Sequence, residues 1–321
     1  MDVVVEDWRD VSDEARHLFE IVNLVVISTA IALAGIVANV INIIIFYRQG
    51  LRTTVNIGFT ALAVSDLLSL VTHEWYFLCF NPLFVSSGLD IVPSEVQHLT
   101  AGFPHTCFKL TTAWIAVYIT FERCLCITSP LKVKRILTPR RTKLVVWVIY
   151  CVMLLSLLPE YSTAYLDWKF YPDANRTLLG LAFTADRAKI EGVSFMLYGI
   201  YMLIAFPILI VCSLILTTKL NHSSKWRQEN SSLGKCLVKE KRTLRMVGVM
   251  SLVFIVTFTP AVSICTSVFV EPEFSVVGRL RNLFFVVSSF GCVCDATNSS
   301  VPILSYYTMS SRYREQFRAL F

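Results

Sequence analysis

The chain has 321 residues, of which 55% are hydrophobic and 16% charged, and its mean hydropathy is +0.61. About a quarter of the residues of ordinary soluble domains are charged, so the composition excludes that class and indicates a membrane protein. The formal net charge of +6 requires no nucleic-acid partner, because basic loops on one face of a membrane account for it.

Seven long apolar runs divide the chain. They are residues 21–47, 55–79, 98–126, 143–165, 194–218, 245–269 and 281–307. A helix needs about 20 mostly apolar residues to cross a bilayer, whereas a spanning strand needs about 9–11 residues of alternating polarity, a pattern that these runs lack. The predicted fold is an all-α bundle of seven transmembrane helices, without a second domain.

Lysine and arginine are unevenly distributed over the loops between these runs. Most of the 29 lie in 48–54, 127–143, 219–245 and the segment after 307. Cytoplasmic loops carry such an excess, so we expect residues 1–20 to form an extracellular tail and the C-terminus to be cytoplasmic. The first 20 residues are acidic and lack the pattern of a signal peptide, so the first span is expected to act as the targeting signal.

Sequons and cysteines indicate less about the topology than the lysine and arginine residues do. Sequons occur at Asn175, Asn221, Asn230 and Asn298, and only Asn175 falls on the expected outer side, as the candidate glycosylation site. The ten cysteines are expected to be reduced packing residues. A Cys79–Cys107 disulfide stays open as an alternative, although helix ends in lipid seldom align two cysteines.

Asp66 lies in the middle of the second span, in ALAVSDLLSL. A charge at that depth costs at least about 2.5–3.5 kcal/mol unless it has partners, so Asp66 is expected to face the bundle interior. The candidate partners in other spans are Asn39, Thr112, Asn298 and Ser299. The alternative is that these polar groups only hold helices together. Asp66 is also a candidate for binding Na⁺, and no other metal site is expected.

The spans resemble those of rhodopsin-like G-protein-coupled receptors. One fragment falls in each span, in the family's order: GIVANV with Asn39, LAVSD with Asp66, ERCLCITSPL, Trp147, Pro207, FIVTFTP with Pro260, and NSSVPILSYY. The resemblance covers residues 21–317, and the ERCLCI variant is most similar to invertebrate peptide receptors and orphan chemosensory receptors. It implies a receptor in the plasma membrane whose residues 308–321 form a short cytoplasmic amphipathic helix.

The resemblance also implies that Arg123 is the family's switch arginine, which acidic partners hold at rest and which is released to meet a heterotrimeric G protein. Pro130 and Leu131 match the loop that contacts the G protein. Glu122 and Arg123 are chain neighbours and are expected to point to different faces of their helix.

Glu240 in the sixth span is the expected partner of Arg123. It precedes Pro260 by 20 residues, or about 30 Å of helix, which places it near the level of Arg123. We therefore expect a Glu240–Arg123 latch. The alternative is that both side chains reach separately toward the membrane surface and never meet.

Proline and aromatic residues mark a bend in the sixth span. Pro260 removes a backbone donor and crowds the preceding turn. Phe254 and Phe258 precede it, and Phe258 stands where the family usually has a tryptophan. We expect these residues to form the bending and toggling part of the sixth helix.

The chain departs from the family pattern in three further places. Pro302-Ile303 replaces the Asn-Pro pair of the seventh helix if Tyr306 is the motif tyrosine. Loop 166–193 contains no cysteine, so the family's usual disulfide cannot form there, and Ile215 stands where the family often has a tyrosine. We therefore expect a looser outer loop and a differently braced active state, with Pro302 still bending the seventh helix.

Six residues in the outer halves of the spans are candidates for a ligand pocket: Glu74, Trp75, His105, Lys109, Tyr198 and Asp295. Ionisable residues inside a membrane are functional by default, and this mixture of charges suits a peptide or a small zwitterion. The resemblance disfavours a monoamine, because receptors for monoamines have an aspartate at the position of His105. A seventh span without lysine disfavours a light receptor. Mutual pairing for structure alone is the alternative.

A transporter or channel is the alternative function, because buried ionisable residues also line transport pathways. The chain lacks an internal repeat, and a transporter would leave the Arg123 motif unexplained. Enzyme motifs are absent from the loops, so neither an enzyme nor a cofactor is expected. The expected partners are a heterotrimeric G protein, an extracellular peptide or small-molecule ligand, and membrane lipid.

Overall fold

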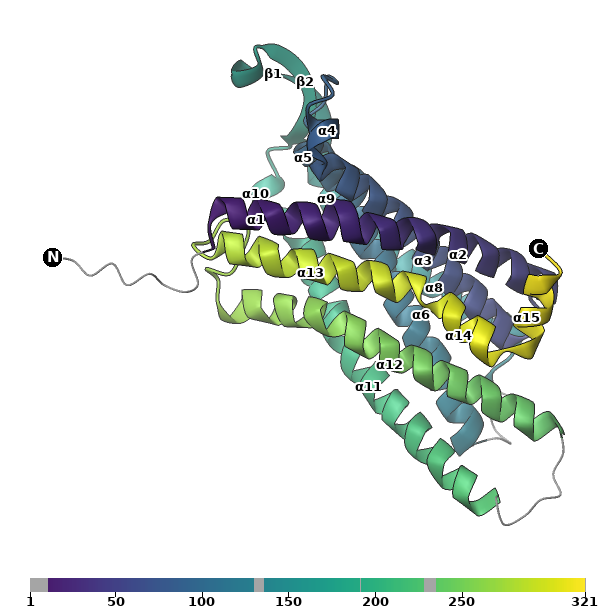
Figure 1. Ribbon diagram of the computed structural model, residues 1–321. Coiled ribbons are helices and arrows are strands. Elements are labelled where there is room, and N and C mark those ends of the chain that lie inside the picture. Colours follow the sequence, from purple (N-terminus) through teal and green to yellow (C-terminus); the bar gives the residue numbers. More distant parts are fainter. Residues whose placement is uncertain (1–10, 130–135, 191, 228–234, 321) are drawn as a thin grey trace.

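A computed structural model of the protein describes residues 11–129, 136–190, 192–227 and 235–320, with the backbone alone for 220–227 and 235–241. Seven helical segments form an elongated bundle (Figure 1). A β-hairpin stands at one end, called the hairpin end below, and helix α15 lies across the other, called the α15 end (Figure 1). The seven-helix all-α bundle predicted from the apolar runs is confirmed.

The seven segments are built from helices that follow the apolar runs. In chain order they are α1 (Asp13–Glu20), η1 (Ile21–Ser28) and α2 (Thr29–Gln49); α3 (Thr54–Phe80); α5 (Pro93–Gln97), η2 (His98–Gly102) and α6 (Phe103–Thr128); α8 (Pro139–Leu155) and α9 (Leu158–Thr163); α11 (Val193–Arg227); α12 (Lys235–Val270); α13 (Arg281–Ser300) and α14 (Pro302–Met309). Short helices α4 (Pro82–Val85), α10 (Arg187–Ile190) and α15 (Ser311–Arg318) complete the described part. In that part, the first six segments are each long and apolar enough to cross a membrane.

The first helix begins at Asp13, inside the region that the sequence assigned to a tail. Ser12 caps it by accepting a hydrogen bond from the Ala15 amide at 3.1 Å, and Asp13 and Glu14 add negative charge at the positive end of the helix dipole. Arg16 Nη1 donates to Asn282 Oδ1 on α13 at 3.0 Å. The helix is therefore eight residues longer at its start than the apolar run.

The seventh segment breaks where the sequence placed its bend. α13 ends at Ser300, and Pro302 opens α14, because proline has no amide hydrogen and suits the first turn of a helix. Ser310 then caps α15 by accepting from the Tyr313 amide at 3.2 Å. Helix α15 occupies most of the segment 308–321, where a short helix was expected.

Two large clusters of buried side chains and a small third one fill the bundle. The large cluster near the α15 end includes Phe46, Phe59 and Tyr306, and the other large cluster, nearer the hairpin end, includes Leu110 and Phe258. Outward faces are apolar as well: Trp147 on α8 is 64% exposed. Apolar residues both inside and outside are expected of a bundle whose surroundings are lipid.

The hairpin consists of β1 (Ala164–Tyr171) and β2 (Arg176–Phe183), which pair antiparallel with Tyr171 opposite Arg176. Asn175 takes the left-handed conformation (φ 49°) that closes the turn, which asparagine tolerates well. Backbone bonds of 2.9 Å join Leu179 to Asp90 and Val92, before α5. The outer loop is thus an ordered hairpin, in contrast to the looser loop that the sequence suggested.

Candidate functional site

Arg123 lies on α6 at the α15 end and is paired with its own chain neighbour. Its Nη2 donates to the Glu122 carboxylate and lies 3.5 Å from Thr54 Oγ1 at the start of α3. Arg123 is 7% and Glu122 1% exposed. The expectation that the two side chains point apart is wrong, because a buried charge needs a partner and the flexible arginine reaches back to the nearest carboxylate.

The other residues expected around Arg123 are only partly described. Pro130 and Leu131 lie outside the described residues, and so does the side chain of Glu240. The Glu240–Arg123 latch therefore stays a prediction. Among the described residues, the contacts that hold α12 against α6 near Arg123 include a hydrogen bond of 2.8 Å between Thr120 and Ser251.

Tyr306 on α14 is buried in the same apolar cluster as Cys124, the residue that follows Arg123. Its ring lies 4.9 Å from Phe46, in a T-shaped arrangement, and 5.1 Å from Phe59, measured between ring centroids. It is 1% exposed, yet its hydroxyl has no hydrogen-bond partner among the described residues. A buried polar group without a partner costs about 1–3 kcal/mol, so this hydroxyl destabilises the arrangement of helices described here.

Asp66 is buried in the bundle interior, with two of its expected partners. Thr112 Oγ1 donates to its carboxylate at 3.0 Å, and the Ser299 side chain also bonds to it. Asn39 donates to the Ser299 carbonyl at 2.8 Å, so it joins indirectly. Asn298 instead accepts from Thr257 on α12 at 3.0 Å. Hydrogen bonds therefore connect four of the five residues that the sequence grouped, and Asn298 lies beside them but bonds to the neighbouring helix α12.

A small cavity of about 40 Å³ lies beside Asp66, and Thr112, Asn298, Phe254 and Pro302 help to line it. This volume accommodates a water molecule or a small ion. The oxygen atoms around it suit a hard cation rather than a transition metal. Among the described residues, no group of three or more His, Cys, Asp or Glu side chains could hold a metal ion.

A much larger cavity, of about 630 Å³, opens between α6, α11, α12 and α13 at the hairpin end. Its volume lies within the range of about 300–1,000 Å³ that is typical of ligand sites. Its lining is mostly apolar and includes Phe103, Phe195, Met202, Val268 and Phe284. Sequence reasoning missed these residues, because an apolar side chain that lines a cavity carries the same signal as one that faces lipid.

Three of the six predicted pocket residues line this cavity: Lys109, Tyr198 and Asp295. The other three do not. His105 stands behind the wall, with Nε2 3.9 Å from Asp295 Oδ2. Trp75 donates to Thr100 at 2.7 Å, and Glu74 has a buried carboxylate oxygen without a hydrogen-bond partner.

Lys109 and Asp295 form the charged part of the cavity. Lys109 Nζ lies 2.5 Å from Asp295 Oδ2, and the two side chains are 19% and 11% exposed. The same ammonium group lies 5.6 Å from the ring centroid of Phe258, on α12 two residues before Pro260. The Phe254 and Phe258 rings are 5.0 Å apart. Lys109 thus contacts both Asp295 in the cavity wall and Phe258 near the expected bend of the sixth helix.

The cysteines form no disulfide among the side chains that the structure describes. Cys79 and Cys107 are both buried, and they are not bonded to each other. The alternative of a Cys79–Cys107 bond is therefore not realised in this structure.

A bundle of membrane-spanning helices with a deep cavity at one end and a buried arginine at the other defines a multi-pass membrane receptor. A family model described as 7 transmembrane receptor (rhodopsin family) matches residues 38–298. The chain belongs to that family, as its motifs indicated. It is a G-protein-coupled receptor and not an enzyme, which sets aside the transporter or channel alternative.

Several curated proteins are similar to the chain over most of its length. Neuromedin-U receptor 2 of Rattus norvegicus is 24% identical over 299 residues, 90% of this chain and 72% of that protein. G-protein coupled receptor 35 of Mus musculus is 23% identical over 293 residues (91% and 86%), and thyrotropin-releasing hormone receptor of Gallus gallus is 21% identical over 328 residues (89% and 75%). The narrower likeness to invertebrate chemosensory receptors stays a prediction.

Proposed function

We propose that this receptor binds an extracellular peptide in the cavity at the hairpin end and signals to a heterotrimeric G protein at the α15 end. Similarity to the peptide-hormone receptors for neuromedin U and thyrotropin-releasing hormone supports a peptide over a small chemosensory molecule. The volume of the cavity, about 630 Å³, leaves room for several side chains of a peptide.

In this proposal the receptor lies in the plasma membrane with its N-terminus outside and its C-terminus inside. The basic loops at the α15 end support that orientation. Asn175, exposed at the turn of the hairpin, is then accessible for glycosylation. The exposed apolar faces contact membrane lipid, and no nucleic acid takes part.

The observation that carries the proposal is the double contact of Lys109. Its ammonium group pairs with Asp295 on α13 and faces Phe258 on α12, so a ligand group that displaces either contact acts on both helices. A charged group of the ligand competes directly for Lys109 or Asp295. A ligand shifts a conformational equilibrium only by its difference in affinity for the two states, and this pair provides that difference.

The signal then reaches Arg123 through the sixth helix. Motion of Phe258 bends α12 at Pro260, and the α15 end of α12 moves away from α6 as the Thr120–Ser251 bond opens. Arg123 leaves Glu122 and becomes available to the G protein, together with Pro130 and Leu131. Tyr306 gains a partner for its hydroxyl in this active arrangement.

The small cavity beside Asp66 fits a Na⁺ ion that would stabilise the resting arrangement. Asp66, Thr112 and Asn298 line this cavity and supply the oxygen atoms that would hold the ion. The ion would supply positive charge next to the buried carboxylate of Asp66.

The switch is tested without any ligand, by basal signalling in a cell-based G-protein reporter. Glu122→Gln removes the charge that holds Arg123, so we expect basal signalling to rise severalfold at equal surface level. Adding Arg123→Ala to that variant should abolish the increase, while Arg123→Lys serves as a charge-matched control. An unchanged increase in the double variant would refute the assignment of Arg123. Antibody staining of an N-terminal tag on intact cells tests the orientation in the same experiment.

A further inference from the structure

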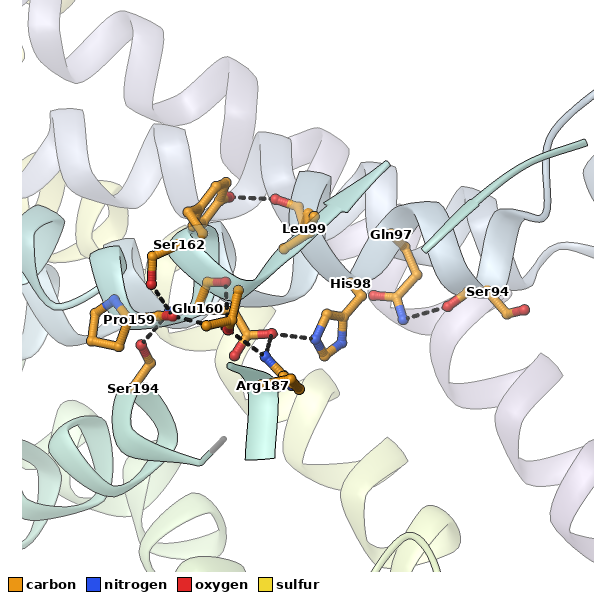
Figure 2. A network of polar contacts seen from close by, with 11 residues as sticks. Ser94, Gln97, His98, Leu99, Pro159, Glu160, Ser162, Arg187 and Ser194 are labelled. Atoms are coloured by element: carbon orange, nitrogen blue, oxygen red, sulfur yellow. Dashed lines mark hydrogen bonds and ion pairs between the residues drawn. The ribbon is translucent and has the colours of Figure 1, made fainter. Parts of the chain in front are cut away.

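The ends of several elements meet around one buried carboxylate at the hairpin end, that of Glu160 on α9 (Figure 2). The Glu160 side chain is 3% exposed. Arg187 Nη1 donates to its Oε1 at 2.7 Å, and His98 Nε2 lies 2.9 Å from the same oxygen. The Glu160 amide donates to Ser194 Oγ on α11 at 3.2 Å. Glu160, in the fourth segment, thus connects η2 of the third segment, α10, and α11 of the fifth segment.

The surroundings hold Arg187 in place for this contact. Its guanidinium group lies 4.7 Å from the ring centroid of Phe183, the last residue of β2, and Nη1 is 3.3 Å from Thr163 Oγ1. Next to Glu160, the Tyr161 hydroxyl donates to the Leu99 carbonyl on η2. The arginine therefore bridges the base of the hairpin to α9.

A second carboxylate attaches the hairpin to α5. Glu95 Oε2 accepts from the Tyr171 hydroxyl at 2.8 Å and from the Leu181 amide at 2.7 Å, so it contacts both strands. Burial and the neighbouring Glu95 raise the pKa of Tyr171 to about 12, which keeps this phenol protonated and able to donate. Gly180 lies opposite, and a Cβ atom at this position would collide with the Tyr171 hydroxyl.

These attachments involve no covalent bond. Loop 166–193 contains no cysteine, and no disulfide joins the cysteine side chains that the structure describes. At the same time His98 lines the large cavity, whereas Glu160 and Arg187 stand behind it. The position of a cavity wall therefore depends on charged groups outside the cavity.

We propose that His98, Glu160 and Arg187 form a noncovalent clasp that fixes the mouth of the ligand cavity and thereby controls access to it. Glu160 and Arg187 are positioning residues, because they act on the cavity through His98 and the base of the hairpin. The ligand-binding role of the cavity rests on the proposed function, but the clasp itself is a statement about access and does not need a known ligand.

The burial of Glu160 explains why its contacts hold these segments together. A carboxylate that is nearly closed to solvent is stable only with charged or strongly donating partners. The guanidinium group of Arg187 supplies the opposite charge, and His98 contacts the same carboxylate oxygen. The segments around Glu160 are therefore held together unless one of these side chains is changed.

Access is measured through two cysteines that line the cavity, Cys265 and Cys292. The probe is a membrane-impermeant methanethiosulfonate reagent applied to intact cells, and the rate of modification is compared with a Cys265→Ser/Cys292→Ser baseline. Glu160→Gln removes the charge at the centre of the clasp. Asp90→Asn is the matched control, because it removes an exposed pair with Arg176 (3.4 Å; 44% and 66% exposed) beside the same hairpin.

We expect Glu160→Gln to raise the modification rate about tenfold, the effect of losing one charged hydrogen bond from the closed state. Arg187→Gln, which changes no cavity-lining residue, should raise the rate in the same direction. Asp90→Asn should leave it unchanged, and dithiothreitol should not open the wild-type cavity.

Unchanged rates in Glu160→Gln and Arg187→Gln at normal surface level would overturn the proposal, and so would opening by dithiothreitol. A third outcome is that Glu160→Gln and Arg187→Gln do not reach the cell surface while Glu160→Asp does. That outcome would show that the cluster serves folding alone, and it would also overturn the proposal. None of these readouts depends on G-protein signalling, so failure of the clasp is distinguishable from failure of the proposed function.

Discussion

Replacing Asp295 with leucine is expected to leave the Lys109 ammonium group without its partner in a nearly closed cavity wall. The two groups are 2.5 Å apart and only 19% and 11% exposed, so solvent screens them little. Removing one member of a buried ion pair costs about 3–5 kcal/mol, because the other charge stays buried and unpaired. His105, 3.9 Å from Asp295, offers Lys109 no compensating negative charge.

The assay is a double-mutant cycle on the purified receptor in detergent, followed by thermal unfolding. Asp295→Leu and Lys109→Met should each lower the melting temperature by about 6–20 °C, from about 3–5 kcal/mol lost and about 2–4 °C for each kcal/mol. The double variant Lys109→Met/Asp295→Leu should recover most of the loss, because an apolar pair replaces a buried ion pair at little cost. Additive losses in the double variant would refute the reasoning, since they would show that the two charges do not depend on each other.

Other predictions follow from single contacts. Tyr306→Phe should leave stability equal or raise it by about 1–3 kcal/mol, because it removes a buried hydroxyl without a partner, and should weaken the stimulated reporter response. Asp66→Asn should abolish any stabilisation of the purified receptor by Na⁺ over K⁺ in a thermal melt; retained Na⁺ dependence would place the ion elsewhere. Asn175→Gln should remove the shift in gel mobility that a glycosidase produces, without loss of surface receptor. Glu240→Ala should raise basal signalling if the latch with Arg123 forms, and unchanged signalling would leave Glu122 as the partner of Arg123.

The fold and part of the site could be predicted from the sequence because they follow from local composition. Apolar runs of about 20 residues specify spanning helices whatever their neighbours, since only helices and closed β-barrels satisfy their backbone hydrogen bonds in lipid, and these runs lack the alternation of barrel strands. The same logic placed Asp66 inside with Thr112 and Ser299, because a mid-span charge has to find polar groups. The break at Pro302 was also predictable, because proline has no amide hydrogen to donate within a helix.

The hairpin was not predicted, because its residues lie in a loop between two apolar runs and carry no clear strand pattern. Residues 164–183 contain two short strands whose pairing depends on contacts with α5, above all through Glu95. Glu160 was missed for a related reason: it ends an apolar span, where a charge is ordinary, and only the folded chain shows that it is buried against Arg187 and His98.

The sequence by itself determined that this protein is a seven-helix receptor, because the length of each apolar run and the order of the motifs can be read from the chain without its fold. It also predicted Arg123 as the switch residue. Only the tertiary structure decided which charges meet. Arg123 pairs with Glu122, and Lys109 with Asp295, a residue 186 positions away along the chain. Partner choice depends on distances of a few ångströms between side chains, and helix packing sets those distances.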